Sequence, residues 1–161
     1  AFADGNYIAL SLRMAKWLAQ DELGIALVFA HELGHNANHH IDDKKTNMQA
    51  GAGVGLLLDI IARSQGVQTD FMSMGANMGA MSYSIDYENE ADYLSVYAIA
   101  MSGYKIDDAA NFWRRFAVEV PGSIYYKGGS HPSTSERYVR IEQTIKEVYA
   151  KINNGEKLLP N

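Results

Sequence analysis

Apolar residues recur with helical spacing along most of the chain. The clearest case lies between Asp21 and Asn38, where apolar residues return every three or four positions: Leu23, Ala26, Leu27, Ala30 and Leu33. Asp21 and Glu22 place negative charge where a helix N-terminus favours it. This pattern predicts a helix from about Asp21 to Asn38. Before it, residues 7–12 follow an Asp-Gly-Asn turn signal and alternate enough to predict a short strand.

The second half of the chain predicts three more helices. The first covers residues 87–101 and is followed by Gly103, a residue suited to a helix C-cap. The next starts at Asp107-Asp108 and ends before Pro121. The last starts at a capping box, Ser133 with Glu136, and continues to about residue 153. Residues 39–46 are polar and predict a loop. With neither a repeat nor a linker, we expect one domain over residues 1–161.

Composition and charge limit the chemistry. Of the 161 residues, 47% are hydrophobic and 20% charged, as expected for a globular protein. Fourteen Lys and Arg against nineteen Asp and Glu give a net charge of −5, so nucleic acid and anionic membranes are poor partners. The longest apolar run, residues 50–62, is shorter than the roughly 20 residues that cross a bilayer. Without cysteine, any metal must be bound by His, Asp and Glu.

The strongest chemical signal is His31-Glu32-x-x-His35, inside the best helical pattern of the chain. Residues four apart lie one turn apart on one helix face, so both imidazoles can bind one zinc ion. Glu32 is rotated by about 100° from His31 and can reach a metal-bound water as a general base. The alternative is a pair of surface histidines beside a helical glutamate.

Catalytic zinc usually has three protein ligands, and Glu88 is the candidate for the third. Glu88 and Asp92 lie one turn apart on the predicted helix over 87–101. If Glu88 binds the metal, Asp92 is placed to accept the ring N–H of a ligating histidine. The alternative is a solvated helix start, where acidic residues favour the helix dipole.

These motifs, together with Gly129-Ser130-His131-Pro132 and Arg137, resemble the HtpX- and BepA-like zinc metallopeptidases, the family that includes the CAAX prenyl proteases. The resemblance implies an α+β fold, a mostly helical gluzincin-like zincin with a small β-sheet beside the active-site helix. It implies one catalytic Zn²⁺ and endopeptidase activity on proteins or peptides, often in periplasmic or membrane-associated quality control. By position, His31, His35 and Glu88 are the ligands, Glu32 is the base and Asp92 orients a ligand.

The remaining candidates are His131, Arg137, His39 and His40. The resemblance places His131 near the metal, where it would stabilise the oxyanion or block the open position; on sequence alone it is a loop histidine. Arg137 is predicted to be an ion-pair partner or a packing residue. His39 and His40 are predicted to be solvated loop residues, with auxiliary metal binding as the alternative.

Residues 47–84 join the two predicted ligand-bearing helices and are rich in Gly, Ala and Met. The segment is far longer than the median loop of about 4–6 residues, and its composition favours loosely packed helices. We expect a lid over the cleft whose apolar face contacts a membrane or a misfolded client. The alternative is a pair of ordinary helices that complete the core.

Three functions therefore remain. The first is a zinc endopeptidase. The second is a non-catalytic module that is stabilised by zinc, has an occluded site and binds clients or membranes. The third is a metal-free helical interaction domain.

Overall fold

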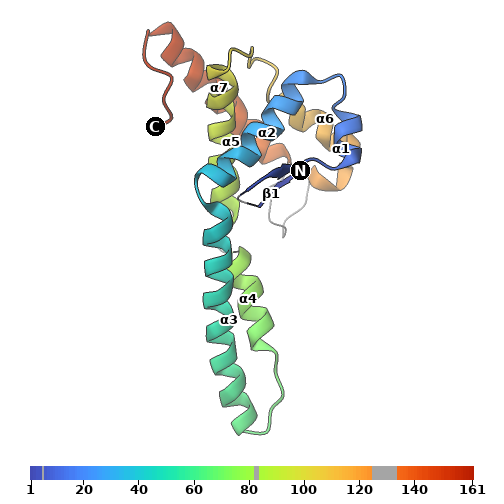
Figure 1. Ribbon diagram of the computed structural model, residues 1–161, viewed down its shortest axis with the longest axis vertical. Helices are drawn as coiled ribbons and strands as arrows, with labels where there is room; N and C mark the ends of the chain where they lie inside the picture. Colours follow the sequence, from blue (N-terminus) through green and yellow to red (C-terminus); the bar gives the residue numbers. More distant parts are fainter. Residues whose placement is uncertain (5, 82–83, 125–133) are drawn as a thin grey trace.

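The computed structural model describes the chain apart from residues 5, 82–83 and 125–133. In the described residues, a compact body of helices carries one long helical hairpin that extends away from it (Figure 1). The elements in chain order are β1 (Phe2–Ala3), β2 (Ile8–Ala9), α1 (Leu12–Trp17), α2 (Glu22–Ala37), α3 (His40–Ser64), α4 (Phe71–Met81), α5 (Ser84–Met101), α6 (Asn111–Glu119), the 3-10 turn η1 (Pro121–Ile124) and α7 (Thr134–Asn153).

Helices α2 and α5 pack against each other at the centre of the body, and α7 covers α5 and α6. Their apolar faces meet in one core, to which α1 and the segment before α6 also contribute. The buried members of this core are Leu18, Leu27, Val28, Val96, Tyr97, Ile99, Ile106, Ala109, Ala110, Phe112, Trp113, Ile141, Ile145 and Val148. Leu27 and Val28 of α2 belong to this core and lie one turn before His31 and Glu32, so the core and the candidate site share the buried side of this helix.

The two strands form a small antiparallel sheet in which Phe2 pairs with Ala9 and Ala3 with Ile8. The sheet lies beside α2. The fold is therefore mostly helical with a small sheet, as predicted. The strand is shorter than the predicted residues 7–12, because the Ser11 side chain accepts a hydrogen bond from the Met14 amide (3.2 Å) and starts α1 at Leu12.

The predicted helix over 21–38 is confirmed. Asp21 is its N-cap, and its carboxylate accepts a hydrogen bond from the Gly24 amide at 2.9 Å. Gly103, at φ +86°, follows α5 as predicted. Helix α6 begins at Asn111 rather than at Asp107-Asp108, because residues 107–110 form turns. Ser133 of the predicted capping box lies outside the described residues.

The predicted polar loop over 39–46 is wrong, because α3 already begins at His40. The break between α2 and α3 is confined to Asn38 and His39, and His39 adopts the left-handed conformation with φ 57°. Asp42 and Asp43 lie in the first turn of α3, where acidic side chains stabilise the N-terminal end of the helix dipole. The prediction failed because the polar composition of an exposed helix is similar to that of a loop.

Helices α3 and α4 pack mainly on each other and contribute no described residue to the hydrophobic core. They approach closely: a Cβ added to Gly75 would lie 2.2 Å from the carbonyl oxygen of Gly51. The hairpin is therefore tightly packed, contrary to the loose packing predicted from its composition. At the tip, the buried Asp59 carboxylate accepts the Thr69 hydroxyl (2.6 Å) and the amides of Phe71 and Met72 (both 2.9 Å), which caps α4.

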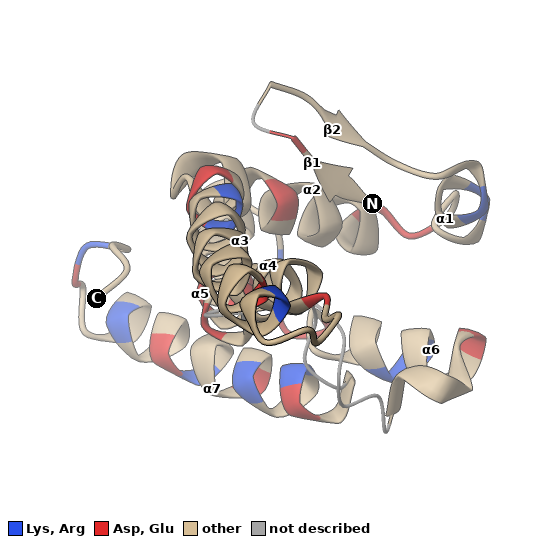
Figure 2. Cartoon of the chain, turned by 90° about the horizontal axis from the view of Figure 1, so that it is seen from below, with Lys and Arg blue, Asp and Glu red and all other residues tan. Residues whose placement is uncertain are grey.

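The outer surface of this hairpin is apolar. Figure 2 shows the two helices end-on with little colour along them, and between residues 47 and 81 only Asp59, Arg63 and Asp70 are charged. Large apolar side chains are exposed on both helices: Val54, Leu56, Leu57, Leu58, Ile60 and Ile61 on α3, and Met72, Met74, Met78 and Met81 on α4. Of the described helices, none is long and apolar enough to cross a membrane.

Candidate metal centre

The site forms where α2 and α5 approach most closely. His31 and His35 lie one turn apart on α2, and Glu88 and Asp92 lie one turn apart on α5. Gly34 allows this approach, because a Cβ at that position would lie 3.3 Å from the Cα of Ala91. The structure therefore brings together the histidines and the two carboxylates that the sequence placed 53 or more residues apart.

His31, His35 and Glu88 form the one group with metal-binding geometry among the described residues. The two Nε2 atoms lie 3.2 Å apart. One Glu88 oxygen lies 3.3 Å from Nε2 of His31, and the other lies 3.3 Å from Nε2 of His35. Ligand atoms about 2.0–2.1 Å from a tetrahedral zinc ion lie about 3.3 Å from one another, so the donor set fits zinc. His31 and Glu88 are 7% and 5% exposed.

Asp92 forms a hydrogen bond with His31 on the side of the ring away from Glu88. Its Oδ1 lies 2.9 Å from Nδ1 of His31, so with Nε2 facing Glu88 the Nδ1–H donates to the carboxylate. Arg137 of α7 binds the same carboxylate with two hydrogen bonds, Nε to Oδ2 at 2.8 Å and Nη2 to Oδ1 at 2.6 Å. The Arg137 guanidinium stacks 3.6 Å above the ring of Trp113. Arg137 is thus both the ion-pair partner and the packing residue that the sequence predicted as alternatives.

The electrostatics of this cluster favour separated charges in the metal-free protein. Burial opposes ionisation of Asp92, but Arg137 and the hydrogen bonds from His31 and Arg137 hold its pKa below the usual range. Burial and Arg137 both lower the pKa of His31, but Asp92 and Glu88 outweigh them, so this pKa is raised. Metal binding at Nε2 of His31 therefore competes with protonation of this ring.

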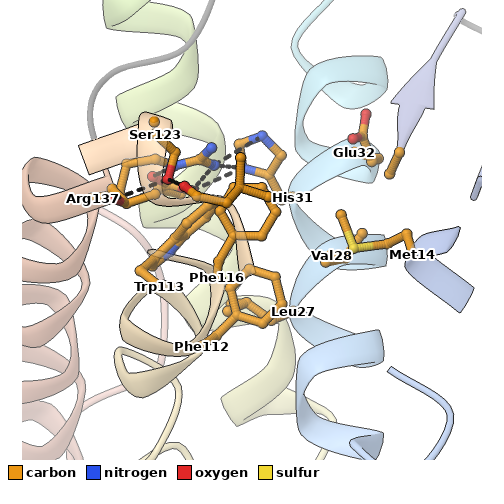
Figure 3. A pocket seen from close by; sticks show the side chains of 15 residues that line it. Met14, Leu27, Val28, His31, Glu32, Phe112, Trp113, Phe116, Ser123 and Arg137 are labelled. Atoms are coloured by element: carbon orange, nitrogen blue, oxygen red, sulfur yellow. Dashed lines mark hydrogen bonds and ion pairs between the residues drawn. The ribbon is translucent and has the colours of Figure 1, made fainter. Parts of the chain in front are cut away.

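Glu32 lies next to the ligand cluster without belonging to it. It is 8% exposed and lines two cavities, one beside His31 and one beside His35 and Glu88. Figure 3 shows Glu32 and His31 leaving the same turn of α2 in different directions. The site therefore holds a buried carboxylate at the cavity wall, as a general base requires.

The cavity beside His31 has a volume of about 440 Å³ and is largely apolar (Figure 3). Leu27 and Val28 of α2 form one wall, and Phe112, Trp113 and Phe116 of α6 form the other. Such a cavity can receive an apolar side chain next to the metal. The second cavity, of about 380 Å³, lies between the base of the hairpin and the site, and Lys44, Met48 and Ala80 contribute to its walls.

His40 is the site residue that sequence reasoning missed, and the prediction that it is solvated is wrong. It is 4% exposed, and its Nδ1 lies 3.1 Å from Nδ1 of His35. Burial and the neighbouring His35 lower its pKa. The signal in the sequence was the position of His40 five residues after His35. Because the chain breaks between α2 and α3 at Asn38 and His39, residues at this spacing come into contact. His39 is exposed, as predicted, and His131 lies outside the described residues.

Comparison with known proteins identifies the family of this chain. Residues 1–145 match the family described as Peptidase family M48. The mitochondrial metalloendopeptidase OMA1 of Schizosaccharomyces pombe is 26% identical over 137 residues, which cover 83% of this chain and 40% of the relative. A putative beta-barrel assembly-enhancing protease of Vibrio cholerae is 29% identical over 123 residues, which cover 71% of this chain and 25% of the relative.

The chain thus spans 40% or less of the length of these two relatives. No solved structure matches it. The family membership and the names of the relatives support a protease function.

Proposed function

Because this chain belongs to peptidase family M48, we propose that it is a zinc-dependent endopeptidase with a gluzincin-type fold. The observation that carries the proposal is the convergence of His31, His35 and Glu88 at the spacing of a tetrahedral site, with Glu32 at the cavity wall. In this proposal residues 1–161 form a single catalytic domain.

The proposed mechanism assigns a role to each residue. His31, His35 and Glu88 would hold Zn²⁺. When bound, the ion supplies Lewis-acid polarisation of a peptide carbonyl and lowers the pKa of a water molecule to about 7. Glu32 takes a proton from the attacking water and delivers it to the nitrogen of the leaving amine. Asp92, held by Arg137, keeps the hydrogen of His31 on Nδ1 and so leaves Nε2 free for the metal.

The substrate is a protein or peptide, and we propose that it places an apolar side chain in the cavity between α2 and α6. The charged groups Asp92 and Arg137 in the lining pair with each other, so they do not demand a charged ligand. His131 keeps its proposed role near the metal, where it acts on the oxyanion or on the open coordination position. We also propose that the endopeptidase acts in protein quality control.

The deciding experiment combines elemental analysis with a casein or peptide cleavage assay. Purified protein should contain one zinc per chain and should lose hydrolysis when a chelator removes the metal. Glu32→Gln should retain zinc and lose hydrolysis, because it removes the base and leaves the ligands. Equal loss of metal and activity in this variant would show that Glu32 has another role.

The exposed hairpin favours a second candidate, a zinc-stabilised module without catalysis that binds membranes or clients. It predicts stoichiometric zinc and no chelator-sensitive cleavage. The third candidate, a metal-free interaction domain, predicts no stoichiometric zinc at all. One set of measurements therefore separates the three.

We further propose that residues 47–84 mediate peripheral membrane association through the apolar surface of the hairpin. The support is its exposed aliphatic and Met side chains and its scarcity of charge. In this structure the hairpin extends away from the body (Figure 1). Of its described residues, only those at the base line the cavity beside His35. A lid role would therefore act through this base, near Met48 and Ala80.

A further inference from the structure

Each proposed ligand histidine has its own hydrogen-bonding partner on the side away from the metal. For His31 that partner is Asp92, which is fixed by Arg137. For His35 it is His40, on the first turn of α3. Because the two helices are separated only by Asn38 and the left-handed His39, the first residue of α3 lies directly behind the last ligand of α2.

The directions of the hydrogen bonds that run from His35 through His40 follow from the metal site. Nε2 of His35 faces Glu88 and His31, so the ring hydrogen must lie on Nδ1 when Nε2 binds a metal. Nδ1–H of His35 then donates to Nδ1 of His40, at 3.1 Å. A neutral His40 that accepts at Nδ1 carries its hydrogen on Nε2, which lies 3.2 Å from Oε2 of Glu90. The carboxylate is thus the final acceptor.

The surroundings hold His40 in this orientation. Its ring stacks on Tyr87 with 4.5 Å between centroids and 13° between planes. The other oxygen of Glu90 accepts from Nδ2 of Asn38 at 2.7 Å. Asn38 is the C-cap of α2, and Tyr87 and Glu90 flank the ligand Glu88 on α5. Three helices therefore converge on one imidazole that is not among the proposed metal ligands.

We propose that His40 is a positioning residue for the metal site, which fixes the tautomer and ring orientation of His35, with Glu90 as the outer anchor. The inference rests on the proposed zinc site and extends it. Partners of this kind typically change metal affinity by about 10–100-fold when they are removed.

The test measures Zn²⁺ affinity by competition with a chromophoric chelator and records the visible absorption spectrum of the Co²⁺-loaded protein. We expect His40→Leu, which keeps volume and removes both hydrogen bonds, to weaken Zn²⁺ binding about 10–100-fold and to alter the Co²⁺ spectrum. His40→Gln should recover most of the affinity, because its amide oxygen accepts from His35 and its NH₂ donates to Glu90.

Two further variants keep the test decisive. His39→Asn changes the adjacent exposed histidine to a residue that tolerates the left-handed conformation, so it should leave affinity unchanged. Glu90→Ala removes a side chain that is 52% exposed, so it should fold normally and weaken zinc binding several-fold even if His40→Leu does not fold.

Unchanged affinity and spectrum in His40→Leu, or in Glu90→Ala where His40→Leu does not fold, would overturn the proposal. So would a His40→Gln variant as weak as His40→Leu, because rescue separates hydrogen bonding from packing. Wild-type zinc binding is measured first and needs no proteolysis. If the wild type binds no zinc, the proposed function fails with the site; if the wild type binds zinc and the variants bind equally, only this inference fails.

Discussion

At the scale of single residues, two carboxylates organise the body of the protein by accepting hydrogen bonds from neighbouring helices. The buried Asp92 does so at the candidate metal centre, and the partly exposed Glu147 does so between α7 and α5. Oε1 of Glu147 accepts the hydroxyls of Tyr93 (2.7 Å) and Tyr97 (2.5 Å), which ties α7 to α5. These hydrogen bonds hold the pKa of Glu147 below its usual value, and Lys151 adds to the effect.

This pKa predicts a pH dependence of stability. Since the folded pKa of Glu147 lies below the unfolded value, its contribution is present above about pH 4.5 and is lost as the pH falls through the folded pKa. We expect Glu147→Gln to lower the free energy of unfolding by about 1 kcal/mol at pH 7, a figure discounted because the side chain is 32% exposed. The difference from the wild type should shrink as the pH falls through the folded pKa of Glu147.

Urea denaturation of the metal-free protein from pH 3 to pH 7 measures this difference. Glu142→Gln is the control on the same helix, because among the described residues the hydrogen bond to Glu142 comes from Tyr138 of its own helix, at 2.7 Å. A pH-independent loss in Glu147→Gln would mean that the side chain contributes through packing and not through its charge.

At the scale of elements, the hairpin shows how glycine sets the distance between helices. Gly51 and Gly75 face each other, and Gly79 lies against the backbone of Asn47 in the same way. Gly53 lies on the same helix as Gly51 and has no neighbouring atom within 4 Å of an added Cβ. Gly51, Gly75 and Gly79 therefore allow the two helices to approach, whereas Gly53 contributes nothing to this contact.

We predict opposite effects for two Gly→Ala substitutions. Gly75→Ala should force α3 and α4 apart, because a Cβ meets backbone that cannot yield, and amide exchange over residues 47–81 should accelerate while α2 and α5 stay protected. Gly53→Ala should slow exchange in α3, because alanine favours a helix interior by about 0.5–1 kcal/mol over glycine. Hydrogen exchange with mass spectrometry measures both.

The same experiment tests the lid. In the wild type, a lid requires faster exchange in residues 47–81 than in α2 and α5, and still faster exchange when a peptide inhibitor occupies the site. Uniform, core-like protection in both states would contradict it.

At the scale of the whole molecule, the protein divides into a body that holds the site and a hairpin that offers an apolar surface. The division predicts that binding to lipid and binding to zinc are separable. Since Gly51 and Gly75 adjoin, residues 52–74 can be replaced by a short Gly-Ser linker without displacing α2 or α5. The shortened protein should bind zinc as the full chain does and should no longer sediment with phosphatidylcholine vesicles.

Full-length Leu57→Lys is the matched control, because this side chain is 62% exposed and packs little. It should weaken vesicle binding and leave zinc binding unchanged. Binding of the wild type should depend little on salt, since the hairpin surface is apolar and the chain carries a net charge of −5. Vesicle binding by the shortened protein would assign the lipid contact to the body, and capture of an unfolded protein in its place would favour a client-binding surface.

The sequence alone determined the elements whose cause is local. Apolar spacing and the acidic residues at 21–22 give α2, and Gly103 marks the end of α5. The four-residue spacing of His31 and His35 follows from helix geometry alone, and so does that of Glu88 and Asp92. For this reason the site candidates within each helix were available from the sequence and from its resemblance to a family.

The tertiary structure decided whatever depends on which helices meet. Close approach of α2 and α5 at Gly34 brings Glu88 to the histidines. His39 adopts the left-handed conformation, and α3 starts directly after it. This connection places the buried His40 in contact with His35. At the glycines of the hairpin, the backbones of α3 and α4 are in close contact. The glycine-rich composition of this segment predicts loose packing instead. These contacts join residues whose local patterns are independent, so the free energy that selects them arises only when the helices pack.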